Sequence, residues 1–307
     1  MSKTGTERSF DNRASSHSGA GKRRLLKLLS VPIFNVLVFF PAQSTLRVNV
    51  DLVNIFLTVH DRDGRYVTGL GREDFRIYED GELRPIEIFE TSDGVRSSLG
   101  LMIDNSGSSA DILRAVKSGV IDFANGLPQD DEIFVMSFGT EDRVVHDFSQ
   151  SVRDVGSSLE QLRSWGTSRL FDALDSAIRK VSGAGSPRKA LIVMSDGYDN
   201  GSERTYLEVV RAAESRTVML YFIGMGPPIL VDTHTMRGLA SVTGGSVVLM
   251  SGDDSPRDAL AAIREDLSHQ YYLGYHASAE RGYHSIRVDV PGADVTVRSR
   301  EGYLVED

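Results

Sequence analysis

The 307-residue sequence contains no cysteine and only one tryptophan. Without cysteine, neither disulfide bonds nor thiolate zinc sites can form. A chain of this length has enough core to fold without such cross-links. Three catalytic signatures are also missing: the nucleophile elbow Gly-x-Ser-x-Gly, the phosphate loop Gly-x-x-x-x-Gly-Lys-Ser/Thr, and a Gly-x-Gly-x-x-Gly fingerprint after the first apolar strand of the central segment. The sequence therefore gives no support to a serine hydrolase, a P-loop NTPase or a dehydrogenase.

Negative charge outnumbers positive charge outside the first part of the chain. Residues 1–44 carry seven Lys/Arg and two Asp/Glu, a net charge of +5, whereas the remainder carries 27 basic and 41 acidic residues, a net charge of −14. An acidic protein repels phosphates, so we expect no nucleic-acid binding by the folded part.

Residues 1–44 have the pattern of a targeting segment. A basic cluster at 22–24 precedes a mostly apolar stretch at 25–40, and the small residues Ala42 and Ser44 follow it, as before a signal-peptidase site. The apolar stretch is shorter than the roughly 20 residues that span a bilayer. We expect a cleaved signal peptide or, as the alternative, an uncleaved anchor that would be the only contact with a membrane. Both place the folded part outside the cytoplasm, as a secreted, periplasmic or cell-surface protein.

Two strand-rich flanks surround the central segment. Residues 45–96 alternate between apolar and polar side chains and contain Asp-Gly turns, which predicts antiparallel hairpins. Residues 269–307 return to the same pattern. Neither flank is long enough to close a core alone, so we expect the two flanks to pack together.

The central segment, residues 97–268, alternates apolar runs with helical stripes. Near-continuous apolar strands are typical of a parallel sheet covered on both faces, and alternation with helices predicts a doubly wound, mostly parallel six-stranded sheet. The expected strands are 99–103, 132–138, 144–148, 190–194, 218–223 and 246–249.

The first of these strands ends in the motif Asp104-x-Ser106-x-Ser108. A carboxylate and two hydroxyls at alternate positions offer hard oxygen ligands, which suit Mg²⁺ or Mn²⁺. A polar turn that caps a helix is the alternative explanation of the same residues.

Two further segments offer similar side chains. Asp196 follows the strand at 190–194, and the hydroxyl pair Thr167 and Ser168 precedes a helical stripe. Ligands of parallel α/β sheets gather outside the carboxyl ends of the strands. We therefore expect these groups to meet at one edge of the sheet.

The three motifs, in this order and spacing, resemble the metal-ion-dependent adhesion site of the von Willebrand factor A domain family, which reads D-x-S-x-S, then a distant Thr, then a distant Asp. The resemblance covers most of residues 97–268. It implies a Rossmann-like fold, a Mg²⁺ or Mn²⁺ ion, and a partner protein that presents an Asp or Glu to the ion. The implied metal ligands are Asp104, Ser106, Ser108, Ser168 and Asp196.

The middle ligand departs from the family pattern. The family usually has a Thr at a fixed distance before the helical stripe, which here begins at Leu170. Counting back from that stripe leads to Ser168, whereas Thr167 stands one residue earlier. We assign Ser168 and keep Thr167 as the alternative.

The flanks resemble a bacterial secreted subfamily related to this A domain. The resemblance rests on Leu70-x-x-Glu73-Asp-Phe75-x-Ile-Tyr-Glu79-Asp-Gly81 before the domain, and on Tyr272, Tyr275 and Gly302-Tyr303 after it. It implies a β-sandwich assembled from both flanks, with the A domain inserted between them.

A binding module therefore explains the sequence best. An aspartyl-phosphate phosphatase would need a second Asp where Ser106 stands, and no general base accompanies the oxygen ligands, so we expect no catalytic residues and no enzymatic activity. The alternatives are a metal-stabilised structural or assembly protein of the cell envelope and, as a minor one, a metal-dependent hydrolase.

Overall fold

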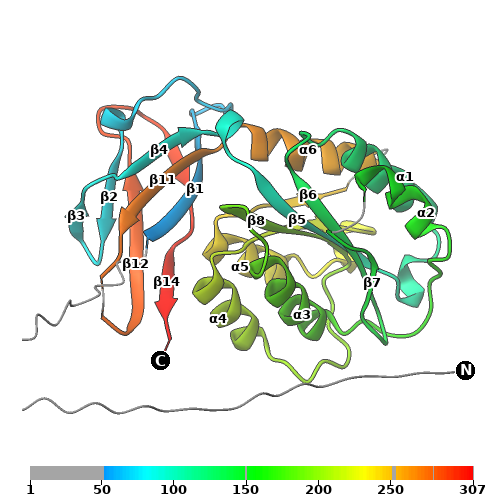
Figure 1. Ribbon diagram of the computed structural model, residues 1–307. Coiled ribbons are helices and arrows are strands. Elements are labelled where there is room, and N and C mark those ends of the chain that lie inside the picture. Colours follow the sequence, from blue (N-terminus) through cyan, green and yellow to red (C-terminus); the bar gives the residue numbers. More distant parts are fainter. Residues whose placement is uncertain (1–51, 149–150, 251–253, 279, 307) are drawn as a thin grey trace, which may run out of the picture. The chain divides into compact units, whose positions relative to one another are not determined.

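The computed structural model describes residues 52–148, 151–250, 254–278 and 280–306 (Figure 1). The targeting segment expected at residues 1–44 lies outside these ranges. Within them the chain forms one six-stranded sheet and two four-stranded sheets. No helix in the described ranges is long and apolar enough to cross a membrane.

The six-stranded sheet has the strand order β10-β9-β8-β5-β6-β7. All neighbours pair in parallel except β7, which runs antiparallel to β6 at one edge. Central strand β5 is buried along its whole length, as its apolar sequence predicts. The strands are β5 (Ser97–Asp104), β6 (Glu132–Phe138), β7 (Arg143–His146), β8 (Arg188–Ser195), β9 (Met219–Gly224) and β10 (Val247–Leu249).

Helices cover both faces of this sheet and create two separate apolar cores. One core forms under α1 (Leu113–Asn125), α2 (Val155–Leu159) and α6 (Pro256–Ser268). The other forms under α3 (Leu170–Ser182), α4 (Tyr206–Arg216) and α5 (Thr233–Thr243). The predicted fold class, a doubly wound and mostly parallel six-stranded sheet with a small β-sandwich from the flanks, is confirmed.

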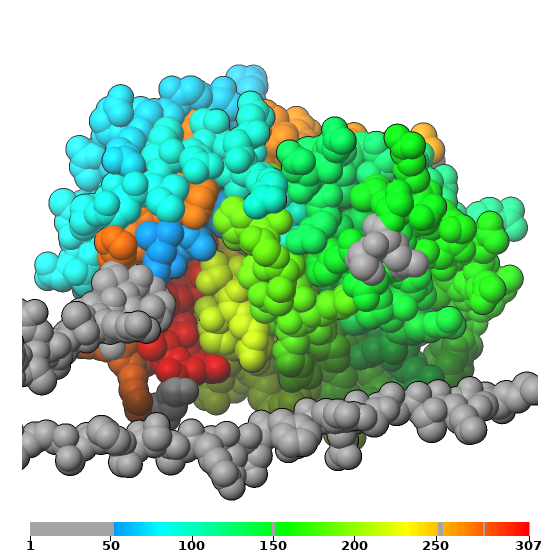
Figure 2. All heavy atoms as spheres, viewed as in Figure 1, coloured from blue at the N-terminus to red at the C-terminus, as the bar shows by residue number. Residues whose placement is uncertain are grey.

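The two four-stranded sheets pack face to face as a sandwich, and each takes strands from both flanks of the chain. Their facing side chains form a third core, which includes Ile55, Ile77, Leu273 and Val288. In Figure 2 the blue and cyan flank and the orange and red flank accordingly lie together on one side. One sheet, in order, is β13 (Thr296–Arg298), β1 (Leu52–His60), β11 (Tyr271–His276) and β4 (Ile88–Thr91); the other is β14 (Gly302–Val305), β12 (Gly282–Asp289), β2 (Arg76–Glu79) and β3 (Glu82–Arg84).

The hairpins expected within residues 45–96 form only in part. Strands β2 and β3 do form one, closed by Asp80 and Gly81, whose φ angles of 51° and 86° suit a two-residue turn. Strands β1 and β4, however, pair with β11 from the other flank. An alternating pattern predicts a strand but not its partner, because the pairing depends on packing between distant segments.

The flank motifs meet in one buried cluster. The carboxylate of Glu79 is fully buried and accepts hydrogen bonds from the hydroxyls of Tyr275, at 3.1 Å, and Tyr303, at 2.5 Å. Arg84 forms an ion pair with the same carboxylate at 2.6 Å. Burial, with the nearby negative charge of Glu79, raises the pKa of both tyrosines. The hydroxyls therefore stay protonated and keep donating, which links the two flanks.

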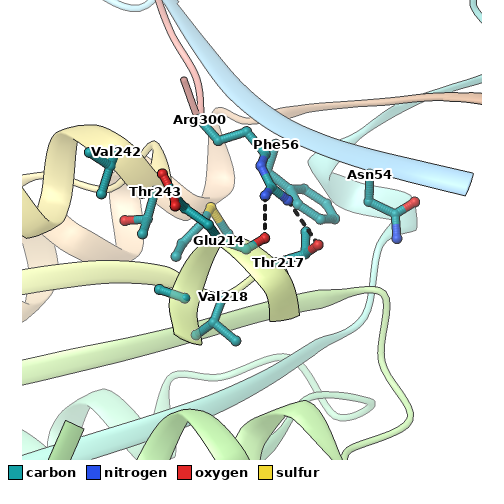
Figure 3. Close-up of a pocket in the computed structure, with 10 residues that line it drawn as sticks. Asn54, Phe56, Glu214, Thr217, Val218, Val242, Thr243 and Arg300 are labelled. Atoms are coloured by element: carbon teal, nitrogen blue, oxygen red, sulfur yellow. Dashed lines mark hydrogen bonds between the residues drawn. The ribbon is translucent and has the colours of Figure 1, made fainter. Parts of the chain in front are cut away.

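Arg300 connects the sandwich to the α/β unit (Figure 3). Its buried guanidinium donates to the carbonyl of Glu214 at 2.7 Å and the hydroxyl of Thr217 at 2.8 Å, both at the carboxyl end of α4. It also donates to the carbonyl of Gly302 at 2.7 Å. Burial lowers the pKa of Arg300 to about 10, which still leaves the group charged at neutral pH. A cation at a helix carboxyl terminus is stabilised by the helix dipole.

The chain itself crosses between the sandwich and the α/β unit at two neighbouring points. Residues 92–96 lead from β4 into β5, and residues 269–270 lead from α6 into β11. Strands β4 and β11 are themselves paired, with Thr91 opposite Tyr271. The chain therefore enters and leaves the α/β unit at the same place, at the amino end of β5.

Candidate metal centre

Asp104 lies at the carboxyl end of β5, where the neighbouring strand β8 also ends. Ile103 of β5 is in register with Met194 of β8, so Asp104 and Ser195 follow side by side. Asp104 is fully buried. The first predicted ligand therefore occupies the edge of the sheet at which α/β proteins bind ligands.

Hydrogen bonds hold the Asp104 carboxylate in place. Its Oδ1 accepts from the backbone N–H of Ser106 at 2.9 Å, and its Oδ2 accepts from the hydroxyl of Ser195 at 2.8 Å. The Ser195 hydroxyl in turn accepts from the N–H of Gly197 at 3.0 Å. The oxygens are thus oriented by neutral donors.

The electrostatic surroundings of Asp104 favour a cation. Burial is the main cause that raises the pKa of Asp104, and the negative charge of Asp196 raises it further, against the lowering effect of the hydrogen bonds from Ser106 and Ser195. In the described part of the chain no Lys or Arg pairs with this carboxylate. A buried carboxylate without a cationic partner is costly, so a bound cation would stabilise it.

Backbone hydrogen bonds bring three loops together around Asp104. The N–H of Gly107 donates to the carbonyl of Gly166 at 3.2 Å, and the N–H of Trp165 donates to the carbonyl of Asn105 at 2.8 Å. On the other side, the N–H of Asn200 donates to the carbonyl of Ser168 at 2.9 Å. The segments expected to supply ligands are therefore neighbours.

The two candidates for the middle ligand differ in burial. Ser168 is 2% exposed, and its hydroxyl has no hydrogen-bond partner within the described ranges. Thr167 is exposed, and its N–H bonds to the hydroxyl of Thr140 at 3.2 Å. A buried hydroxyl without a partner is a group that a ligand could satisfy, which favours Ser168.

The remaining predicted ligands lie in the same loops. Ser106 is buried two residues after the end of β5. Half-buried Asp196 lies directly after β8, where its Oδ1 accepts from the N–H of Tyr198 at 3.1 Å. Ser108 belongs to the short helix η3 (Gly107–Ser109), but its side chain is outside what the structure describes. The assignment of all five residues as metal ligands stays a prediction.

Sequence analysis did not single out two residues of this site. Ser195 bonds directly to Asp104, and its only signal was its position at the strand end beside Asp196. Asn105 is buried next to Asp104, and its Oδ1 has no partner among the described residues. Each of the two residues is next to a predicted ligand in the sequence. The residues adjacent to a predicted ligand are therefore reasonable candidates for a role in positioning it.

The chemistry of these groups fits a hard divalent cation. The donors are carboxylate and hydroxyl oxygens, which suit Mg²⁺ or Mn²⁺. No group of three or more His, Cys, Asp or Glu side chains suited to a metal occurs in the part of the chain that the structure describes. Any divalent ion here would therefore depend on the hydroxyls as well as on Asp104 and Asp196.

Comparison with known protein families identifies the domain that contains the candidate metal centre. The family model described as "von Willebrand factor type A domain" matches residues 98–249. This chain contains a von Willebrand factor type A domain. The A domain accounts for the six-stranded sheet, and the resemblance seen in the sequence is confirmed. Domains of this family are usually binding modules without catalytic activity.

Several solved structures are similar to the chain. A von Willebrand factor type A protein from Catenulispora acidiphila is 13% identical, with 83% of this chain and 74% of that chain covered and a TM-score of 0.49. Protein BatB from Bacteroides thetaiotaomicron is 17% identical, with 57% and 99% covered and a TM-score of 0.47. The manganese-loaded TRAP protein of Plasmodium vivax is 17% identical, with 75% and 99% covered and a TM-score of 0.48. A search of curated proteins found no match.

Proposed function

We propose that the protein is a metal-dependent protein-binding module that acts outside the cytoplasm, either secreted or at the cell surface. Its A domain would hold Mg²⁺, or Mn²⁺, through Asp104, Ser106, Ser108, Ser168 and Asp196. The observation that carries this proposal is the fully buried Asp104 carboxylate, which has only neutral donors around it. The compartment rests on the targeting pattern of residues 1–44.

The charge of this ligand set explains why a partner would be acidic. Two carboxylates and neutral hydroxyls leave a divalent ion with little surplus negative charge around it, so the bound ion attracts a further carboxylate. An Asp or Glu of a partner protein supplies that group. Ser195 contributes by fixing the orientation of Asp104, since its hydroxyl both donates to Oδ2 and accepts from Gly197.

Capture from an envelope or culture extract tests the proposed function. With the full chain as bait, we expect at least one protein to be retained in Mg²⁺, released by EDTA, and absent when the bait carries Asp104→Ala. Asp63→Ala is a matched control, because it removes an exposed carboxylate from a sandwich turn and should change nothing. The same proteins bound in every condition would instead favour a structural role in the cell envelope.

The middle ligand can be tested separately. We expect Ser168→Ala to weaken Mg²⁺ binding about ten-fold or more, because it removes a buried hydroxyl beside the carboxylates. Thr167→Val should have little effect, because Thr167 is exposed. Isothermal titration of both variants gives the ranking, and the opposite ranking would assign the ligand to Thr167.

A further inference from the structure

Exposed apolar side chains gather around the candidate metal centre. Four of them lie in loops at the carboxyl edge of the six-stranded sheet: Trp165, Tyr198, Ile229 and Leu230, with 54%, 45%, 88% and 60% of their surfaces exposed. We call these four residues the apolar rim. The other large apolar side chains that are exposed in the described ranges are Leu83, Val144, Leu207 and Tyr283.

Hydrogen bonds fix the apolar rim on both sides of the metal centre. On one side, Trp165 is tied to Asn105, directly after Asp104, by its backbone N–H. On the other side, Ile229 and Leu230 form part of η5 (Pro228–Leu230), whose loop is tied to β8. There the N–H of Met225 donates to the carbonyl of Ser195, and the N–H of Asp232 donates to the carbonyl of Asp196, each at 2.8 Å. The rim therefore flanks the ligands.

The loop that carries Ile229 and Leu230 is held in a defined conformation. Pro227 and Pro228 have fixed φ angles, and the N–H of Leu230 donates to the carbonyl of Pro227 at 2.8 Å. These two apolar side chains thus stay exposed although each would gain about 25 cal/mol for every Å² covered. Apolar side chains that stay exposed to solvent next to a group of polar side chains are typical of a binding site.

We infer that the apolar rim selects partners in which the acidic residue is flanked by large apolar side chains. The inference rests on the proposed function, because the metal centre supplies the positive charge that holds the acidic residue. The rim then contacts the neighbouring residues of the same peptide segment. A membrane surface is the competing occupant, and the vesicle experiment below distinguishes it from a protein.

A random peptide library displayed on phage tests this specificity. Phage are selected on the full chain in Mg²⁺ and eluted with EDTA. We expect Asp or Glu to be enriched at one position and Leu, Ile, Phe or Trp to be enriched beside it. Trp165 is the only tryptophan of the chain, so its emission directly reports binding of a synthetic consensus peptide.

Substitutions in the apolar rim distinguish its contribution to peptide binding from that of the metal centre. Ile229→Ser/Leu230→Ser should leave Mg²⁺ affinity unchanged and weaken binding of the consensus peptide at least about ten-fold. Leu83→Ser is the matched control, since Leu83 is 59% exposed but lies on the sandwich strand β3. That variant should bind the peptide as the natural chain does.

Three outcomes would overturn the inference. Enrichment of acidic residues without apolar neighbours would reject the role of the rim and leave the proposed function standing. An absence of Mg²⁺-dependent acidic peptides would reject both. Binding to phosphatidylglycerol vesicles that is lost in Ile229→Ser/Leu230→Ser would assign the rim to a membrane instead.

Discussion

Asp104→Ala should lower the affinity for Mg²⁺ and Mn²⁺ by at least about a hundred-fold. Loss of a group that only orients a metal ligand costs 10- to 100-fold, and Asp104 is expected to be a ligand itself. The fold should survive, because the substitution removes a buried charge that the metal-free protein does not pair with a cation. Isothermal titration measures the affinity, and circular dichroism verifies the fold. Unchanged affinity would show that the ligand set is wrong.

The pH dependence of metal binding provides an independent check. Burial raises the pKa of Asp104 in the folded protein above its value in the unfolded chain. As pH falls through the raised pKa, the folded protein takes up a proton at Asp104, and the destabilisation caused by the ionised carboxylate is relieved. A proton competes with the metal, so Mg²⁺ affinity should fall over the same range. Asp104→Asn cannot take up this proton. In that variant, the gain in stability at falling pH should disappear, and so should the part of the fall in Mg²⁺ affinity that is due to Asp104.

Removal of residues 269–307 should abolish the sandwich and make the remaining chain aggregate. The deletion takes away β11, β12, β13 and β14, two of the four strands of each sheet, including β11, which lies between β1 and β4. Strands β1, β2 and β4 would then present unpaired edges and an uncovered apolar face, which favours aggregation. The measurement is the soluble fraction after expression, followed by urea denaturation of whatever remains soluble.

Complementation provides the control for this deletion. Residues 269–307 expressed as a separate polypeptide should restore solubility, because the pairing with β1 and β4 does not require a continuous chain. A truncated chain, residues 45–268, that stays soluble and unfolds cooperatively would argue against a core shared between the flanks.

The strands of the A domain could be predicted because their signal is local. Each expected strand in the central segment overlaps an observed one. For the buried parallel strands such as β5, β8 and β9 the reason is that each is apolar along nearly its whole length and is bounded by polar loops. In the flanks, the Asp80-Gly81 turn predicted a hairpin, but the bounds of β3 could not be predicted, because Glu82 and Leu83 are exposed and show no core-facing alternation. The pairing of β11 with β1 and β4 depends on contacts between segments far apart in the sequence, which no local pattern contains.

The candidate metal centre could be predicted to a similar extent. Asp104 and Asp196 could be named as candidates because each follows an apolar strand and because the order and spacing of the motifs resemble the family pattern. Ser195 was missed because a small hydroxyl residue at a strand end also packs well without any function. The order of Ser168 and Thr167 rested on counting from a helix, and only their different burial gives a physical reason for it.

The position of the two attachment points has a mechanical consequence. Asp104 lies at one end of β5, and the connection to the sandwich lies at the other end, roughly 25 Å away for a strand of this length. A partner that pulls on the metal edge therefore puts β5 under tension along its axis. Because β5 is bonded to β6 on one side and to β8 on the other, stretching it requires both ladders to shear at once. The strand that would bear the load of the proposed partner is thus an inner strand, held by a ladder of hydrogen bonds on each side.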